Sequence, residues 1–152
     1  MTEQPVTPVI RRATPDDIEM LIDMNAEYCA AEQVPADPQR ARSGLAPLLA
    51  DDTHGSVHMV LDPAGSVVGY AVVARSWSVE IGGSEVVLDE LFVRTRSQGI
   101  GGRAIEALAS YCRERGVKRI FLETERRNER ARTLYARHGF CEDDSIWMSR
   151  DL

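Results

Sequence analysis

The segment from Glu85 to Glu125 constrains the fold of this chain more than any other. It predicts a strand over 85–93, a glycine-rich turn over 98–102, a helix that stops at Gly116, and a second strand over 118–125. A helix that connects two strands of one sheet brings them parallel and packs against one face. The chain is therefore predicted to contain a parallel strand pair.

The residues on either side of this unit predict further strands and helices. Thr14-Pro15-Asp16-Asp17 is typical of a helix start, and Asn128 is a favourable N-cap for a late, short helix. In chain order, the additional elements are expected at 9–12, 14–33, 39–49, 57–61, 67–74, 128–138 and 146–148. The order βααβββαβαβ indicates a mixed α/β fold with an antiparallel meander before the parallel unit.

Length and composition limit the organisation and the location of the chain. Its 152 residues, 43% of them hydrophobic, suffice for one core, so a single domain over 1–152 is expected. No run approaches the roughly 18 uninterrupted apolar residues of a membrane span, and the N-terminus lacks the order of a signal peptide. We therefore expect a cytoplasmic protein without a membrane partner.

The charge distribution restricts the binding partners. A net charge of -6 argues against a nucleic-acid partner. However, 12 of the 18 basic residues and only five of the 24 acidic ones lie between Arg94 and Arg137. This separation of basic and acidic residues suits an anionic cofactor and a cationic substrate. Charged residues on solvent-exposed helix faces would give the same distribution.

Metal and disulfide chemistry are not expected. Cys29, Cys112 and Cys141 form no Cys-x-x-Cys pair and are predicted to be reduced thiols. The three histidines lack the spacing of metal ligands.

The glycine-rich turn is a candidate phosphate site. A helix N-terminus offers unpaired N–H groups and a partial positive charge, and Gly99 and Gly101 would let the backbone approach an anion. The pattern Gly99-x-Gly101-x-x-Ala104 also satisfies the relaxed dinucleotide fingerprint, and a purely structural turn remains open. A nucleoside-triphosphate loop is excluded, because no Gly-Lys-Ser/Thr follows.

Two motifs together resemble a known family. Residues 96–101 form Arg-x-x-Gly-x-Gly, and residues 128–140 form Asn-x-x-Ala-x-x-Leu-Tyr-x-x-x-Gly-Phe. In this order they resemble the GNAT superfamily of acetyl-CoA-dependent N-acetyltransferases, over residues 77–148. The resemblance implies the acyl-CoA N-acyltransferase fold and direct transfer of an acetyl group from acetyl-CoA to an amine. The interval from Val93 to Gly99 is shorter than the usual family loop.

The resemblance also implies which residues hold acetyl-CoA. The backbone of the strand would pair with the pantetheine arm, the turn would hold the pyrophosphate, and Asn128 would help to position the co-substrate. In chain order, these residues are Leu91, Phe92, Val93, Arg96, Ser97, Gln98, Gly99, Ile100, Gly101, Gly102 and Asn128.

Three carboxylates are candidates for the general base. An attacking amine must lose a proton, because free alkylamines are mostly protonated near neutral pH. Asp89 and Glu90 lie in the expected strand, and Glu80 is a third candidate. Strict alternation would put Asp89 on the face of Leu91 and Glu90 on the other, and we favour Glu90.

Tyr135 is the candidate general acid. The resemblance implies that it protonates the departing thiolate, whereas its helical neighbours alone would predict a core residue. Acidic residues at Glu32, Asp37 and 142–144 favour a small cationic amine as acceptor. Two alternatives remain, namely a non-catalytic acetyl-CoA-binding module and a dinucleotide-dependent oxidoreductase with Glu123 at the ribose. Exposed strand edges near the C-terminus would allow a homodimer.

Overall fold

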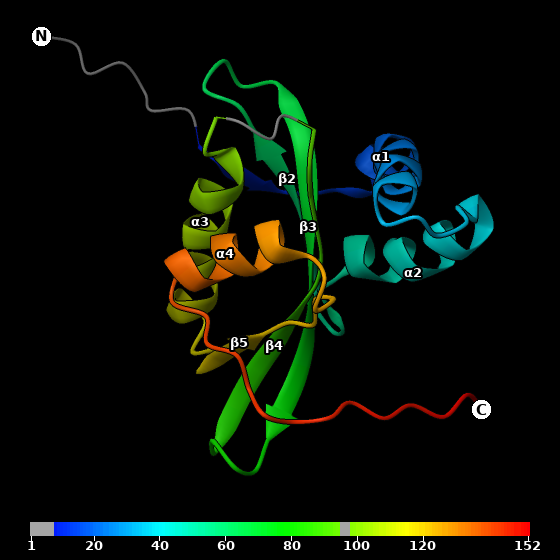
Figure 1. Cartoon of the computed structure of the whole chain (residues 1–152). Coiled ribbons are helices and arrows are strands. Elements are labelled where there is room, and N and C mark those ends of the chain that lie inside the picture. The colour runs from blue at the N-terminus through cyan, green and yellow to red at the C-terminus, as the bar shows by residue number, and fades with distance from the viewer. Residues whose placement is uncertain (1–7, 95–97) are drawn as a thin grey trace, which may run out of the picture.

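A five-stranded sheet lies between two helical layers in the computed structural model, which describes residues 8–94 and 98–152 (Figure 1). In chain order, the elements are β1 (Ile10–Arg12), the 3-10 turn η1 (Pro15–Asp17), α1 (Ile18–Ala31), α2 (Pro38–Ala50), β2 (Gly55–Leu61), β3 (Val67–Ser78), β4 (Gly83–Val93), α3 (Ile100–Glu114), β5 (Arg119–Phe121) and α4 (Glu129–Arg137).

The strand order is β1-β2-β3-β4-β5. The first four strands are antiparallel to their neighbours, and β4 and β5 are parallel. The predicted meander and the predicted parallel pair are therefore confirmed. The meander brings every antiparallel strand next to its sequence neighbour, and only the β4–β5 step needs a crossover helix, which is α3.

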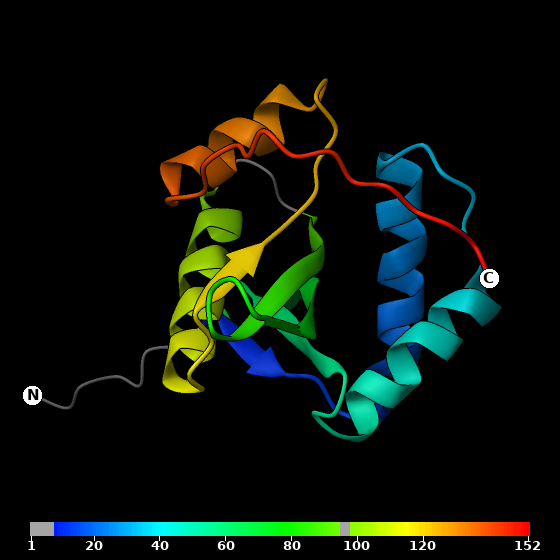
Figure 2. The same ribbon diagram turned by 90° about the horizontal axis from the view of Figure 1, so that it is seen from below.

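Each face of the sheet has its own core. Leu21 and Met24 of α1 pack with Tyr70 on one face, and all three side chains are fully buried. On the opposite face, Leu108 of α3 packs against the sheet, and Ile100 packs near the start of the same helix. Figure 2 shows the same division from below, with α1 and α2 on one side and α3 and α4 on the other. The apolar period of each helix thus matches one sheet face.

The expected last strand is not formed. Residues 140–152 contain no strand, and β5 is three residues long instead of spanning 118–125. The tail contacts the sheet through a ring stack of Trp147 on Phe121, with centroids 5.7 Å apart, while Ile146 and Met148 are 89% and 90% exposed. It runs from α4 toward the side of α1 and α2 (Figures 1 and 2). Residues 146–148 are an apolar run, but such a run forms a strand only where a partner strand is available, and β5 ends at Phe121.

Within residues 8–94 and 98–152, no helix is long and apolar enough to cross a membrane.

Candidate active site

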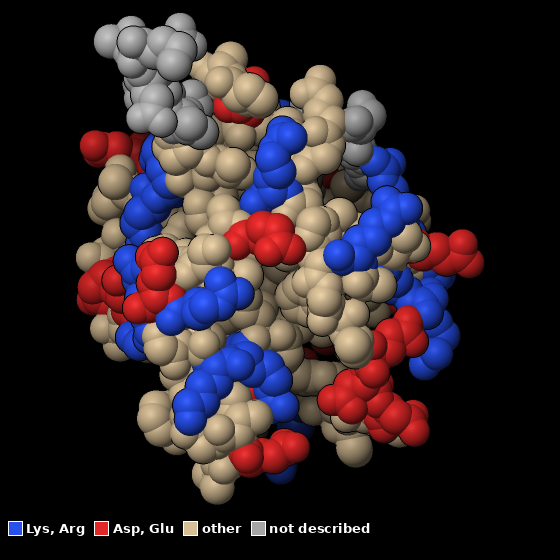
Figure 3. Space-filling model, turned by 90° about the vertical axis from the view of Figure 1, so that its left-hand side faces the viewer, with Lys and Arg blue, Asp and Glu red and all other residues tan. Residues whose placement is uncertain are grey.

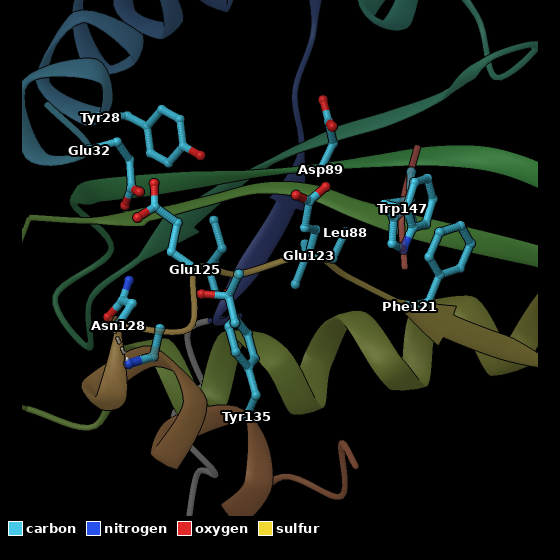
Figure 4. A pocket seen from close by; sticks show the side chains of 14 residues that line it. Tyr28, Glu32, Leu88, Asp89, Phe121, Glu123, Glu125, Asn128, Tyr135 and Trp147 are labelled. Carbon is cyan, nitrogen blue, oxygen red and sulfur yellow. Dashed lines mark hydrogen bonds between the residues drawn. The ribbon is translucent and has the colours of Figure 1, made fainter. Parts of the chain in front are cut away.

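A candidate site is a cavity of about 470 Å³ that opens where β4 and β5 diverge. The two strands pair through Glu85, Val86 and Val87 of β4, and beyond this point the described part of β4 has a strand partner on the β3 side alone. Figure 4 shows the side chains that line the cavity. They are Tyr28, Glu32, Val87, Leu88, Asp89, Leu91, Phe121, Glu123, Thr124, Glu125, Asn128, Ala131, Tyr135 and Trp147.

A bulge in β4 overturns the expected alternation of its carboxylates. Val72 pairs with Glu90 and Val73 with Leu88, so Asp89 is an extra residue without a partner in β3. Leu88 and Leu91 consequently pack in the same core against α3. The prediction that Asp89 shares the face of Leu91 is wrong, because one inserted residue shifts the alternation of everything after it.

Glu90 points to the α1 face, where two side chains hold its carboxylate. Tyr70 Oη donates to Oε2 over 2.6 Å, and Asn25 Nδ2 donates to Oε1 and Oε2 over 3.3 and 3.2 Å. Burial raises the pKa of Glu90, and the bonds from Tyr70 and Asn25 oppose that rise by stabilising the ionised form. A carboxylate with a raised pKa is a stronger proton acceptor than an exposed one.

Asp89 is exposed and lines the cavity directly. Figure 4 shows it on the same side of the strand as Tyr28 of α1, whereas Tyr135 lies on the other side, next to the helices α3 and α4. Burial and the charges of Glu90, Glu32 and Asp89 raise the pKa of Tyr28. Tyr28 therefore keeps its proton among three carboxylates and can donate a hydrogen bond there.

Tyr135 of α4 lines the cavity and also packs in the core. Its ring meets Phe140 edge to face, with centroids 5.5 Å apart, and contacts the core beneath α3. Burial raises the pKa of its phenol, so Tyr135 is protonated at neutral pH. The helical pattern predicted that Tyr135 lies in the core, and the family resemblance predicted that it lies in the active site. The side chain contacts both.

The start of α3 has the features of an anion site. Gly99 is the N-cap with φ of 68°, no side chain caps the helix, and the first turn carries no acidic residue. A Cβ at Gly101 would meet only Leu134 Cδ2 at 3.5 Å, whereas one at Gly102 would lie 2.5 Å from His138 Nε2. Gly101 thus leaves space beside the helix end, and Gly102 permits close packing of α3 on α4. Of the predicted contacts, Arg96 and Ser97 lie outside the described residues.

The remaining predicted residues fall into two groups. Asn128 caps α4, as expected, by accepting a 3.2 Å bond from the Ala131 N–H, and it lines the cavity. Leu91 lines it as well, whereas Phe92 packs in the core on the α1 face. Glu80 lies in the turn between β3 and β4 and does not line the cavity.

Four carboxylates line the cavity, Glu32, Asp89, Glu123 and Glu125. Glu125 forms an ion pair with Arg127. Of the acidic residues expected near the acceptor opening, Glu32 is in place, while Asp37 caps α2 and Glu142 pairs with Arg132. The cavity is therefore more acidic than the sequence alone indicated.

Ion pairs partly neutralise the basic segment. Arg94 bonds Glu27 over 2.8 Å, and Arg119 bonds Glu85 over 2.9 Å. Figure 3 shows acidic and basic side chains interspersed over the face that α3 and α4 form. The described part of this face is therefore not uniformly basic.

Several site residues escaped the sequence analysis. Asn25 is a polar residue within the apolar period of α1. Its hydrogen-bond partner Glu90 is 65 residues away, so the sequence did not indicate the bond. Tyr70 resembled any aromatic residue in a valine-rich strand. Trp147 was assigned to a strand that does not form.

The histidines have other roles. His58 Nε2 lies 2.9 Å from Ser56 Oγ, and His138 Nδ1 lies 2.8 Å from Glu106 Oε1. Among the described residues, no three histidine, cysteine or acidic side chains are grouped to hold a metal ion.

Comparison with known proteins gives consistent results. The family model described as "Acetyltransferase (GNAT) family" matches residues 19–140. The chain is 29% identical over 136 residues to YhfO of Bacillus subtilis (strain 168), which is described as an uncharacterized N-acetyltransferase. That match covers 88% of this chain and 90% of the relative.

Solved structures share the fold. An integron cassette protein from the mobile metagenome of Cole Harbour Salt Marsh superposes with a TM-score of 0.84 at 25% identity, covering 100% of this chain and 95% of that one. A putative acetyltransferase from Arthrobacter sp. FB24 gives 0.82 at 25% identity, covering 99% and 100%. An aminoglycoside acetyltransferase from an uncultured soil metagenomic sample, in complex with sisomicin, gives 0.74 at 19% identity, covering 94% and 95%.

Proposed function

This chain belongs to the GNAT family of acetyltransferases, and from that premise we propose that it transfers an acetyl group from acetyl-CoA to a primary amine. The proposal treats residues 1–152 as one catalytic domain that acts in the cytoplasm. The observation that carries it is the cavity between the diverging strands, which Asp89 of β4 and Tyr135 of α4 both line, with Glu90 next to Asp89 in the strand.

The site suits acetyl-CoA in two respects. The uncapped start of α3 presents backbone N–H groups, which fit a pyrophosphate. Beyond Val87, the edge of β4 has no strand partner among the described residues and offers main-chain groups to an extended, amide-containing chain. Residues 91–93 and 96–102, with Asn128, would hold the co-substrate. When bound, it supplies the acetyl group as a thioester.

Glu90 is the proposed general base. Its pKa is raised by burial, and Tyr70 and Asn25 fix its carboxylate. Because Glu90 itself does not line the cavity, it would take the proton through a water molecule. Asp89, which does line the cavity, would bind the ammonium form of the acceptor before deprotonation.

Tyr135 is the proposed general acid. Its phenol is protonated at neutral pH and borders the cavity from the side opposite Tyr28. A proton from Tyr135 Oη would neutralise the thiolate as it leaves, and direct attack by the amine requires no covalent enzyme intermediate.

A cationic small molecule is the proposed acceptor. Asp89, Glu32 and Glu123 line the cavity, and none of the three has an ion-pair partner among the residues that the structure describes. An acceptor with a second positive charge would therefore gain more than a simple monoamine. Among the fold neighbours, one aminoglycoside acetyltransferase is in complex with sisomicin.

The two alternatives have less support. A dinucleotide-dependent oxidoreductase would have repeated βαβ units, whereas this sheet has one parallel pair after an antiparallel meander. A non-catalytic acetyl-CoA-binding module would not need a half-buried glutamate held by two hydrogen-bond donors.

A homodimer is also proposed. The exposed Ile146 and Met148 alternate along an extended tail without a strand partner, next to the short edge strand β5. A second copy could provide the missing partner.

The test combines binding and turnover. Thermal unfolding is measured with acetyl-CoA, NAD and NADP, and thiol release from acetyl-CoA is measured over a panel of mono- and polyamines. Stabilisation by acetyl-CoA and amine-dependent thiol release are expected. Stabilisation by NAD alone would contradict the proposal, and binding without release on any amine would favour the non-catalytic module.

A further inference from the structure

A second cavity, of about 330 Å³, lies on the α3 face of the sheet. It shares no lining residue with the first cavity. Its walls come from the start of β2, the adjoining part of β3, and the C-terminal end of α3. The lining side chains that matter here are Ser56, Arg75, Val86, Tyr111, Arg115 and Val117.

Two arginines line this cavity with free donors. The Arg115 guanidinium lies 3.6 Å from the centroid of the Tyr111 ring, and its Nη1 donates to the Tyr111 carbonyl over 3.2 Å. Arg75 Nη1 donates to the Asp52 carbonyl over 3.2 Å. Over the described chain, neither guanidinium has a carboxylate partner. A guanidinium stacked on a ring keeps its in-plane N–H groups available for an anion.

The carboxylate that lines the cavity does not neutralise them. Asp52 lines the cavity, but its Oδ1 bonds Arg12 Nη2 over 2.8 Å. Three arginines and one aspartate therefore meet at this corner of the sheet. The surplus of positive charge favours an anionic ligand.

His58 lies close to the same charged groups. Burial is the main cause that lowers the pKa of His58 to about 4; the charges of Arg12 and Arg115 lower it further, and the charge of Asp52 opposes them. The imidazole packs edge to face on Tyr111, with centroids 4.4 Å apart, and is neutral at pH 7. Its bond with Ser56 places a polar group at the cavity wall without adding charge.

The rest of the cavity is apolar. Val73, Val86 and Cys112 belong to the core beneath α3, and Val117 packs against the same core. A ligand with only a charged group, such as an inorganic anion, would leave this surface in contact with water. A ligand with an apolar body would cover it.

We propose that this cavity binds a small organic carboxylate, whose charged group meets Arg75 and Arg115 and whose apolar body rests on Val86, Val117 and Tyr111. The site is separate from the acetyl-transfer cavity and does not depend on the function proposed above.

The test uses benzoate as the probe and benzamide as its uncharged isostere. Each is titrated into the isotopically labelled full chain, and backbone amide shifts are recorded by NMR. Benzoate is expected to cause saturable shifts around Gly55, Val73 and Val117, and benzamide none. Arg115→Ala should weaken benzoate binding by about tenfold or more, because a charge-assisted bond is lost. Arg113→Ala, two residues earlier at an exposed position of α3 that does not line the cavity, should leave it unchanged.

A second variant controls for the possibility that Arg115→Ala weakens binding because the protein is misfolded. Arg75→Ala should weaken binding to a similar extent, and the dispersion of each variant's spectrum shows whether it is folded. The proposal is overturned if benzoate causes no saturable shifts, if the shifts cluster at the start of α3, if benzamide binds equally well, or if Arg113→Ala weakens binding as much as Arg115→Ala.

Discussion

Tyr70 donates a 2.6 Å hydrogen bond to Glu90 across the sheet, from a fully buried position on β3 to the residue that follows the bulge in β4. The bond fixes a carboxylate whose pKa burial has raised. The bulge turns Glu90 toward Tyr70, so a feature of the sheet positions the proposed general base.

Removing this bond should change the pH dependence of catalysis. The acidic limb of kcat/KM reports the pKa of the essential base in the free enzyme. Tyr70 stabilises the ionised form of Glu90, so Tyr70→Phe should raise the pKa of Glu90 further. The limb should move to higher pH by about one unit, the value of a charge-assisted bond of about 1.5 kcal/mol.

Tyr111→Phe is the matched control, since it removes a phenol hydroxyl on the other face of the sheet. The acidic limb of the kcat/KM profile of Tyr111→Phe should coincide with that of the wild type. A Tyr70→Phe limb that stays in place or moves to lower pH would contradict the role of Glu90.

The two neighbouring carboxylates should have separable effects. Glu90→Gln keeps the shape of the side chain but removes the base, so kcat should fall by about 100-fold or more. Asp89→Asn should chiefly raise the KM for the amine, because Asp89 is an exposed wall residue. Steady-state kinetics at saturating acetyl-CoA distinguish the two. A larger loss of kcat in Asp89→Asn than in Glu90→Gln would assign the base to Asp89.

Gly102 should tolerate a side chain only when His138 is absent. A Cβ would lie 2.5 Å from His138 Nε2, so the ring must turn away and lose its bond to Glu106. Gly102→Ala should therefore lower the free energy of unfolding by about 1 kcal/mol. In a His138→Ala background the same change should be neutral or stabilising by up to about 1 kcal/mol, because alanine favours a helix.

Urea denaturation of the four proteins measures both effects. Gly101→Ala serves as a control, because its Cβ would meet only Leu134 at ordinary contact distance. Equal effects of Gly102→Ala in both backgrounds would show that the contact with His138 is unimportant.

The C-terminal tail should determine the oligomeric state. The wild type is expected to sediment as a dimer, and Ile146→Asp with Met148→Asp to sediment as a monomer, because charges would replace the exposed apolar residues of the tail. Ser145→Asp with Ser149→Asp adds the same charge at the alternate positions and should remain dimeric. A wild type that is monomeric at all concentrations contradicts the proposed dimer.

Most of the fold could be predicted from local patterns. The glycine turn before α3, the Asn128 cap and the valine-rich meander each depend on residues within a few positions of one another. The parallel pair followed from one strand-helix-strand unit.

The features that the sequence did not predict depend on contacts between residues far apart in the chain. The pattern at Ile146 and Met148 is strand-like, but a strand needs a neighbour, and β5 ends at Phe121. The bulge at Asp89 is a mismatch between β3 and β4, which β4 alone does not reveal. The network of Asn25, Tyr70 and Glu90 joins three elements, so no spacing in the sequence predicted it.

The most direct test of the proposed acetyl transfer follows the acetyl group itself. The protein is incubated with isotopically labelled acetyl-CoA and a panel of mono- and polyamines, and the amines are analysed by mass spectrometry, with Tyr135→Phe in parallel. The expected result is a labelled N-acetyl product, more abundant for polyamines, whose rate of formation falls about 100-fold in Tyr135→Phe. The absence of any labelled amine, from a protein that acetyl-CoA stabilises against unfolding, would contradict it.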